Sequence, residues 1–151
     1  MKTVKDILDS KQKVFNTINP DMMVIDALVQ LNSVNLSYLI VTEGDKYKGI
    51  FSERDYTRNV ILKGRASNST AVKEVMTVDF PMVTLEDSAE HCMHLMNAHK
   101  VRYLLAYDND RRFVGVITIH DLLRQVIASK EEVFDHSAAQ ELLENDEGRV
   151  F

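Results

Sequence analysis

A hydroxyl residue followed three positions later by an aspartate occurs twice in this chain, in matching surroundings. The first copy is Ser52 with Asp55, and the second, 66 positions further on, is Thr118 with Asp121. An ionised carboxylate only accepts hydrogen bonds, and the two adjacent hydroxyls of a ribose can donate two of them. Each aspartate is therefore a candidate for holding a ribose diol, and each hydroxyl residue a candidate for contacting ribose or phosphate oxygens.

The alternative role for each pair is structural, because both aspartates stand where a helix is expected to begin. An aspartate near a helix start is more often a cap of that helix than a ligand for a small molecule. For one pair alone, capping is the better interpretation. The same pairing found twice favours binding, and the positive end of a helix would favour the charged form of either carboxylate.

The two pairs belong to a longer internal repeat that covers most of the chain. The matching segments are 4–8 with 72–76, 38–41 with 103–106, and 49–55 with 115–121. A duplication on this scale predicts two similar halves. Such halves can pack about a pseudo-twofold axis, which places two equivalent clefts at their junction.

The first half predicts the order strand, helix, strand, strand, helix. A short strand at 17–18 leads to Pro20, after which apolar residues recur with helical spacing. These are Val24, Ala27, Leu28 and Leu31. Two extended segments then flank a turn at 43–46 and predict a hairpin. A last helical pattern, 53–62, ends where Gly64 can act as a C-terminal cap.

The second half predicts the same order of elements. The strand at 83–85 is followed by a helix that Asp87 or Ser88 can cap. Its apolar positions are Ala89, Cys92, Met93 and Met96. A hairpin with its tip at 108–110 comes next, with 113–118 as its second strand. The final helix is expected to bury Leu122, Leu123, Val126 and Ile127.

The duplicated βαββα unit, with Gly-apolar-apolar-Ser/Thr-x-x-Asp between its last strand and last helix, resembles a tandem pair of CBS (cystathionine β-synthase) domains, or Bateman module. The resemblance implies an α/β (α+β) fold with two βαββα CBS repeats related by a pseudo-twofold axis. The predicted boundaries are 1–64 for the first repeat, 65–71 for the connection, 72–130 for the second repeat and 131–151 for an acidic tail. Residues 53–56 also resemble small stand-alone bacterial CBS-pair proteins with no attached enzyme.

The resemblance implies a regulatory module that binds an adenosyl ligand between its repeats, without a catalytic cofactor. AMP, ATP, NAD(H) and S-adenosylmethionine share the adenosine that Ser52, Asp55, Thr118 and Asp121 would grip. The strands that the resemblance places at the adenine slot contain Thr17 and Ile18 in one half and Val83 and Thr84 in the other. Two tyrosines, Tyr38 and Tyr103, either line this slot or bound the phosphate side of the site, or else they are core residues with exposed hydroxyls.

Phosphate groups need cations, and the two copies differ in what they offer. The candidates are Arg54, Arg58, Arg102 and His120. His120 takes the place of Arg54 in the second copy, and an imidazole is only a conditional cation, whereas a guanidinium forks around phosphate. We therefore expect one site to bind phosphate better. The alternative for Arg54 and Arg58 is a solvated helix face.

A rival arrangement is a metal site, because His91 and His94 stand three positions apart on a predicted helix. Cys92 points elsewhere, and closed zinc sites need four ligands, so structural histidines are the better interpretation. The alternatives to a ligand-sensing module are therefore a small metal-dependent enzyme using His91 and His94, or an interaction scaffold with empty clefts.

Composition indicates the class of protein, its cellular compartment and the partners to expect. The chain has 151 residues, 45% of them hydrophobic, which suits one soluble globular unit without a membrane span or an N-terminal signal peptide. Cys92 is the only cysteine, which fits a cytoplasmic protein. The first 130 residues hold 17 basic and 16 acidic side chains, so nucleic acid is a poor partner.

The resemblance also implies a homodimer that forms a flat disc of four CBS units, joined through apolar helix sides such as 122–127. A regulated partner protein would sense the bound ligand. The acidic segment 137–151 is either a short helix packed on the partner subunit or a tail.

Overall fold

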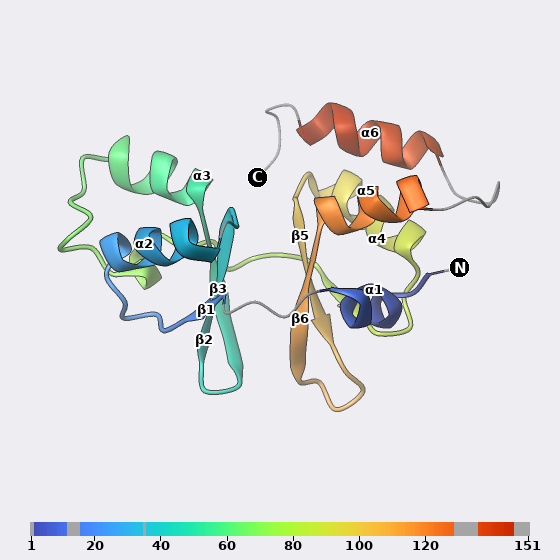
Figure 1. The fold of residues 1–151 in the computed structure, drawn as a ribbon, viewed down its shortest axis with the longest axis horizontal. Helices are drawn as coiled ribbons and strands as arrows, with labels where there is room; N and C mark the ends of the chain where they lie inside the picture. The colour runs from blue at the N-terminus through green and yellow to red at the C-terminus, as the bar shows by residue number, and fades with distance from the viewer. Residues whose placement is uncertain (1, 12–15, 35, 129–135, 147–151) are drawn as a thin grey trace. The chain divides into compact units, whose positions relative to one another are not determined.

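The computed structural model describes residues 2–11, 16–34, 36–128 and 136–146 of the chain (Figure 1). The chain divides into two compact units. One consists of Gln12–Asp79, and the other combines Met1–Lys11 with Phe80–Phe151. Each unit has its own three-stranded sheet and its own apolar core.

The unit Gln12–Asp79 contains a mixed sheet in the order β1-β2-β3. Strand β1 runs parallel to β2, and β2 pairs with β3 as an antiparallel hairpin. The hairpin turns at Gly44, whose φ of 60° is a conformation that glycine adopts without steric strain. The elements are β1 (Thr17–Ile18), α2 (Val24–Val34), β2 (Tyr38–Glu43), β3 (Lys46–Ser52), α3 (Glu53–Asp55), the π-helix η1 (Tyr56–Ile61) and the 3-10 helix η2 (Val72–Glu74).

The unit that includes Phe80–Phe151 repeats this sheet with β4-β5-β6, again parallel and then antiparallel. Helix α4 begins at the cap that the sequence predicts, since the Ser88 hydroxyl accepts a hydrogen bond from the His91 amide at 3.0 Å. The elements are α1 (Val4–Ser10), β4 (Met82–Thr84), α4 (Ala89–His99), β5 (Tyr103–Tyr107), β6 (Phe113–Thr118), α5 (Ile119–Ala128) and α6 (His136–Asp146).

The predicted α/β fold with two βαββα repeats is confirmed, and most predicted core positions are buried. One prediction is wrong: Ile127 does not belong to the buried face of its helix, because 84% of it is exposed. Leu122, one turn after the helix start, is fully buried, so the helix runs past the edge of the core towards its C-terminal end. The predicted final helix of the first half is also irregular, with a π-helix from Tyr56 to Ile61.

Helix α6 lies in the acidic segment that the sequence left open between a helix and a tail. Its side chains Ala138, Ala139 and Leu142 are buried in the same apolar cluster as Met93 and Met96 of α4. Figure 1 shows α6 beside α5 and α4, and the Asn97 side chain donates a hydrogen bond to the Ala138 carbonyl at 3.2 Å. The helix therefore completes the core of its own chain.

The segments that open the two predicted repeats, 4–8 and 72–76, are exchanged between the units. In Figure 1, α1, at the blue end of the colour scale, packs among the elements of the second half, where Val4 and Ile7 join the core around Val83. Conversely, Val72 and Val75 pack in the core of the unit Gln12–Asp79. Each core is thus completed by the opening segment of the other predicted repeat.

This exchange explains the glycine that opens each copy of the repeated motif. A Cβ atom at Gly49 would lie 2.7 Å from Met76 Sδ and 3.1 Å from the carbonyl oxygen of Thr77. A Cβ atom at Gly115 would lie 3.0 Å from Cδ2 of Leu8. Glycine at both positions lets the exchanged segment approach the last strand of the sheet closely.

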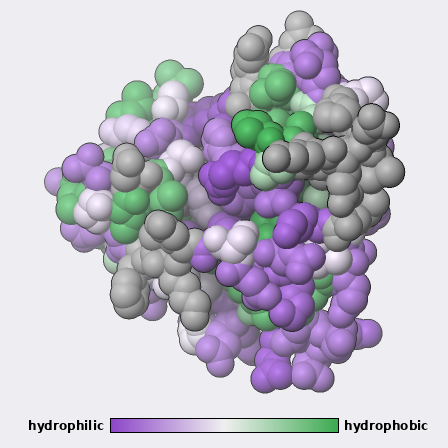
Figure 2. Space-filling model, turned by 45° about the vertical axis from the view of Figure 1, so that its right-hand side comes forward, coloured by the Kyte–Doolittle hydropathy of each residue, from purple (hydrophilic) through white to green (hydrophobic). Residues whose placement is uncertain are grey.

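Apolar side chains are also exposed on the surface, and Figure 2 shows them in patches among hydrophilic residues on one face. In the unit Gln12–Asp79 they are Ile25, Val29, Ile61, Leu62 and Val78, and in the other unit they are Met82, Val114, Ile127 and Leu143. In the described part of the chain, no helix combines the length and the apolar character that a bilayer crossing requires.

We expect Gly49→Ala to lower the free energy of unfolding by roughly 1–3 kcal/mol, because the new methyl group crowds a backbone oxygen as well as Met76. Gly115→Ala is the matched comparison and should cost less, since the end of the Leu8 side chain can turn away. Urea unfolding followed by circular dichroism measures both. Equal losses in the two variants would contradict the close approach at Thr77.

Candidate functional site

The first hydroxyl and carboxylate pair forms a reciprocal cap where β3 meets α3. The Ser52 hydroxyl accepts from the Asp55 amide at 3.3 Å, and Asp55 Oδ2 accepts from the Ser52 amide at 2.8 Å and from its hydroxyl at 3.0 Å. This capping box fixes the carboxylate at the strand end. Asp55 is only 1% exposed.

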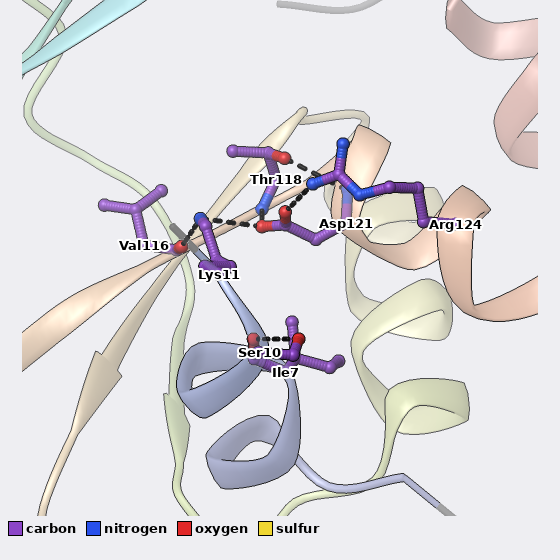
Figure 3. A network of polar contacts seen from close by, with 7 residues as sticks. All are labelled: Ile7, Ser10, Lys11, Val116, Thr118, Asp121 and Arg124. Carbon is purple, nitrogen blue, oxygen red and sulfur yellow. Dashed lines mark hydrogen bonds and ion pairs between the residues drawn. The ribbon is translucent and has the colours of Figure 1, made fainter. Parts of the chain in front are cut away.

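The second pair repeats this geometry where β6 meets α5 (Figure 3). The Thr118 hydroxyl accepts from the Asp121 amide at 3.2 Å, and Asp121 Oδ2 accepts from the Thr118 amide at 2.8 Å. Asp121 is buried as well. Both aspartates therefore cap helices, as the structural alternative predicted, and their binding of a ribose stays a prediction.

The exchanged segments supply a further hydrogen bond to each carboxylate. Thr77, which follows η2, donates its hydroxyl to Asp55 Oδ1 at 2.7 Å. The backbone of Thr77 is anchored beside β3, because it exchanges hydrogen bonds of 2.8 and 2.9 Å with Ile50. Lys11, at the end of α1, donates its ammonium to Asp121 Oδ2 at 2.9 Å. A neutral donor thus serves one carboxylate and a cation the other.

A second cation, Arg124, contacts the other oxygen of Asp121. Its Nη2 lies 2.5 Å from Oδ1. Figure 3 marks this contact with a dashed line. Arg124 stands 66 positions after Arg58, so it is the repeat partner of a residue that the sequence analysis did name. The repeat itself was the signal that could have found Arg124. Lys11 and Thr77 carry no such signal, because they lie outside the repeated motif and reach it only through the exchange of segments.

Burial raises the pKa of Asp55, since a buried carboxylate loses its hydration. The hydrogen bonds from Thr77 and Ser52 and the charge of Arg58 oppose this effect without cancelling it. A raised pKa means that the folded state binds the proton more tightly than the unfolded state does. The contribution of Asp55 to stability therefore falls as the pH rises from the ordinary aspartate pKa through the raised one.

The two predicted tyrosines lie directly opposite the hydroxyl residues of the motif. Tyr38 pairs with Ser52 across the hairpin, and Tyr103 pairs with Thr118. Both tyrosines are buried, and the Tyr103 ring meets Phe80 edge to face at a centroid distance of 5.5 Å. The structure thus brings each tyrosine beside its motif, on the neighbouring strand.

The residues predicted for the adenine slot divide between the core and the surface. The side chains of Ile18 and Val83 are buried in the two cores, while Thr17 and Thr84 are exposed. The strand registers pair Ile18 with Val41 and Val83 with Ala106, so Ile18 and Val83 are equivalent. Thr17 and Thr84 therefore lie on opposite sides of that equivalent position, and the two strands present different residues beside it.

The predicted cations differ in how far their side chains are buried. Arg54 and Arg102 are half-buried, whereas Arg58 and His120 are exposed. Arg102 precedes β5, and its carbonyl accepts a hydrogen bond of 3.0 Å from the amide of Ile119, the residue between Thr118 and His120. Its backbone thereby connects the start of β5 to the second motif.

The histidines of α4 do not assemble with other ligands in the described residues. His91 and His94 are exposed, whereas Cys92 is fully buried, as expected from its place among the apolar positions of the predicted helix. Burial raises the pKa of the Cys92 thiol to about 12, so it stays protonated near neutral pH. Across the described ranges, no group of three His, Cys, Asp or Glu side chains is placed to hold a metal ion.

Comparison with known proteins identifies the family. The model of the CBS domain matches residues 4–61 and 72–128. The chain belongs to the CBS domain family. Its two matched segments form a tandem CBS pair, which confirms the resemblance seen in the repeated motif.

Relatives share this CBS arrangement over most of the chain. The CBS domain-containing protein CBSX3, mitochondrial, of Arabidopsis thaliana is 30% identical over 139 residues, which cover 86% of this chain and 67% of that protein. A solved CBS-domain protein from Burkholderia ambifaria MC40-6 is 33% identical with a TM-score of 0.76, covering 89% of this chain and all of the other.

Two further comparisons bear on ligands and on larger proteins. The crystal structure of CBSX2 in complex with AMP shares the fold at 23% identity, with a TM-score of 0.67, over 85% of this chain and 98% of that chain. An inosine-5'-monophosphate dehydrogenase of Methanocaldococcus jannaschii is 31% identical over 110 residues, but the match covers 72% of this chain and only 21% of that enzyme.

We expect Asp121→Asn to lower the free energy of unfolding by roughly 1–3 kcal/mol more than Asp55→Asn does. An amide at position 121 would lose two ion pairs and turn a donor towards Lys11 or Arg124. At position 55, the Thr77 hydroxyl can turn and accept instead. Urea unfolding at pH 7 measures the difference, and equal losses would contradict the unequal partners.

The same series tests the raised pKa of Asp55. As the pH rises through the Asp55 titration, the wild type should lose stability relative to Asp55→Asn. A stability difference that stays constant with pH would contradict the effect of burial.

Proposed function

We propose that this CBS pair is a regulatory module that binds an adenosyl ligand at its two motifs. The observation that carries the proposal is the repeated junction in which a hydroxyl residue and a buried aspartate cap each other. Helix capping alone does not require the same pair of residue types at both junctions. A hydroxyl residue and an aspartate are nevertheless present at each of them. AMP in the CBSX2 complex supports an adenine nucleotide as the ligand class.

Each carboxylate has room for a further hydrogen bond, which a ribose hydroxyl could donate. A carboxylate offers about four acceptor positions, and three hydrogen bonds are described at each aspartate. A ribose diol would take the remaining position and displace one mobile donor. The backbone amides of Ser52 and Thr118 keep each carboxylate oriented while this happens.

The rest of the ligand would contact the residues around each motif. Tyr38 and Tyr103 lie beside the motifs, and Thr17, Ile18, Val83 and Thr84 would offer backbone edges to the adenine ring. Phosphate would be held by the guanidinium groups of Arg54, Arg58 and Arg102, with His120 as a weaker substitute. The two motifs are then related but unequal sites.

Regulation requires that the ligand bind one conformation of the pair more tightly than another. A partner protein that senses the favoured conformation would then respond to the ligand concentration. In this proposal the chain is a binding module and not an enzyme, and no catalytic cofactor is involved. An empty interaction scaffold is the outcome that a failure to bind would indicate.

Thermal shift with AMP, ATP, NAD(H) and S-adenosylmethionine tests the proposal. We expect at least one of them to stabilise the protein, by about 2.7 kcal/mol at a ligand concentration of 100 times Kd. The single variants Asp55→Ala and Asp121→Ala should each lose part of the ligand-induced stabilisation seen in the wild type. The double variant should lose all of it.

The matched control is Asp9→Ala, which removes an exposed aspartate that also pairs with a lysine. This variant should keep the full ligand response. No response of the wild type to any of the ligands would overturn the proposed function. Stabilisation by zinc that is lost in His94→Ala would favour the metal-dependent alternative.

We also propose that the chain forms a homodimer through the exposed apolar side chains of its helices. Among the described residues, Ile127 on α5 is the most exposed of them, and Ile25 and Val29 stand one turn apart on α2. An exposed apolar surface is stabilised when a second copy covers it. The homodimer would join two copies of the module.

Sedimentation at micromolar concentration should give twice the mass of one chain. Ile127→Asp should shift the protein towards the monomer, because it places a charge in the contact. Val114→Asp changes an exposed apolar residue on a strand and serves as the control that keeps the dimer. A monomeric wild type would contradict the proposal.

A further inference from the structure

Lys11 occupies the carboxylate that the proposed ribose would use at the second motif. Its ammonium lies 2.9 Å from Asp121 Oδ2 and 2.9 Å from the carbonyl oxygen of Val116. Figure 3 marks both contacts with dashed lines. The side chain of Lys11 is 25% exposed, whereas that of Asp121 is almost completely buried. The ammonium therefore reaches from the surface to a buried anion.

The first motif is built differently at the same point. There, Asp55 Oδ2 accepts from the Ser52 hydroxyl, and Oδ1 accepts from the Thr77 hydroxyl. Either hydroxyl can rotate towards another acceptor without separating an ion pair. A ribose can thus replace a neutral donor at Asp55, whereas the side chains that it can replace at Asp121 are both cations, Lys11 and Arg124.

Replacing Lys11 separates a charge-assisted hydrogen bond, which is roughly twice as strong as one between neutral groups. A ligand without an anionic group leaves the displaced ammonium without its partner. A ligand with a phosphate supplies a new anion beside the same motif. The lysine side chain suits such an exchange, because its ammonium is a point charge on a flexible four-carbon stem.

Arg124 does not take part in this exchange in the same way. It contacts Oδ1, the oxygen that Lys11 does not use, and 65% of its side chain is exposed. With Lys11 moved, Arg124 still balances the charge of Asp121. The carboxylate therefore keeps a cationic partner while Oδ2 accepts hydrogen bonds from a diol.

We propose that Lys11 makes binding at the Asp121 motif depend on the phosphate of the ligand. Lys11 is thus a specificity-determining residue that selects phosphorylated adenosyl ligands over uncharged ones at this motif. This inference rests on the proposed function, because it concerns one of the two proposed sites. It assigns a role to a residue that lies outside the repeated motif and 110 positions away from Asp121 in sequence.

Calorimetry with AMP and with adenosine tests the proposal at a single site. The background variant is Asp55→Ala, which removes the first site and leaves the Asp121 motif intact. We expect this protein to bind AMP more tightly than adenosine. Adding Lys11→Met should lower the ratio of the adenosine Kd to the AMP Kd by about tenfold, because adenosine gains and AMP loses.

Two matched variants separate charge from position. Lys11→Arg keeps a mobile cation and should retain a preference for AMP. Lys5→Met removes another lysine of α1, which pairs with Asp9 at the surface, and should leave the ratio unchanged. If Lys11→Met does not fold, Lys11→Gln provides the same loss of charge, and its ratio should fall likewise.

The outcomes distinguish this inference from the proposed function. An unchanged ratio in Lys11→Met, with AMP still bound, overturns the role of Lys11 and leaves the function standing. Equal strengthening of AMP and adenosine also overturns it, because Lys11 would then only block the site. Binding of AMP by the wild type but not by Asp55→Ala overturns it as well. If the wild type binds none of AMP, ATP, NAD(H) and S-adenosylmethionine, the function itself is overturned.

Discussion

The reciprocal hydrogen bonding between a hydroxyl residue and an aspartate at the end of a strand is the interaction on which each CBS unit depends. It turns the chain from the last strand into the last helix and holds a carboxylate in the interior. A buried carboxylate without partners would be unstable. Every other feature of the site, including the approach of Thr77 and Lys11, serves or uses this buried charge.

The donors that complete the two carboxylates show how the repeats have diverged. In the unit Gln12–Asp79, the exchanged segment donates a neutral hydroxyl, that of Thr77, to Asp55, and the pKa of the Asp55 carboxyl is raised. In the other, two cations surround the carboxylate. The inequality predicted from Arg54 and His120 concerns phosphate directly. The structure adds an inequality at the carboxylate itself, which the motif residues alone do not contain.

The fold could be predicted from the sequence because its signals are local and occur twice. Helical spacing placed Ala27 and Cys92 in the cores, and the pairing of Tyr38 and Tyr103 with the motif hydroxyls follows from the two hairpins. Ile127 was misplaced because periodicity shows which side of a helix is apolar but not where the core ends. The π-helix after Asp55 has no periodic pattern by which it could be recognised.

The site was predicted less completely, since part of it depends on contacts between distant residues. Ser52, Asp55, Thr118 and Asp121 could be found from their spacing, and Arg124 from its match to Arg58. Lys11 and Thr77 could not, because no property of either residue tells which carboxylate it will meet. The glycines 49 and 115 were seen as part of the motif, but only the exchanged segments explain why a side chain is excluded there.

The exchange of segments also orders the events of folding during synthesis. A ribosome makes the chain from its N-terminus, so the unit Gln12–Asp79 has all its parts once residue 79 has emerged. Helix α1 is made before the unit Gln12–Asp79, yet its place in the core lies among residues from Val83 onward, which are made after that unit. Helix α1 therefore cannot dock until the second unit has been made. Its docking brings Lys11 to Asp121 and closes a loop of 110 positions, which is entropically costly and slow to form.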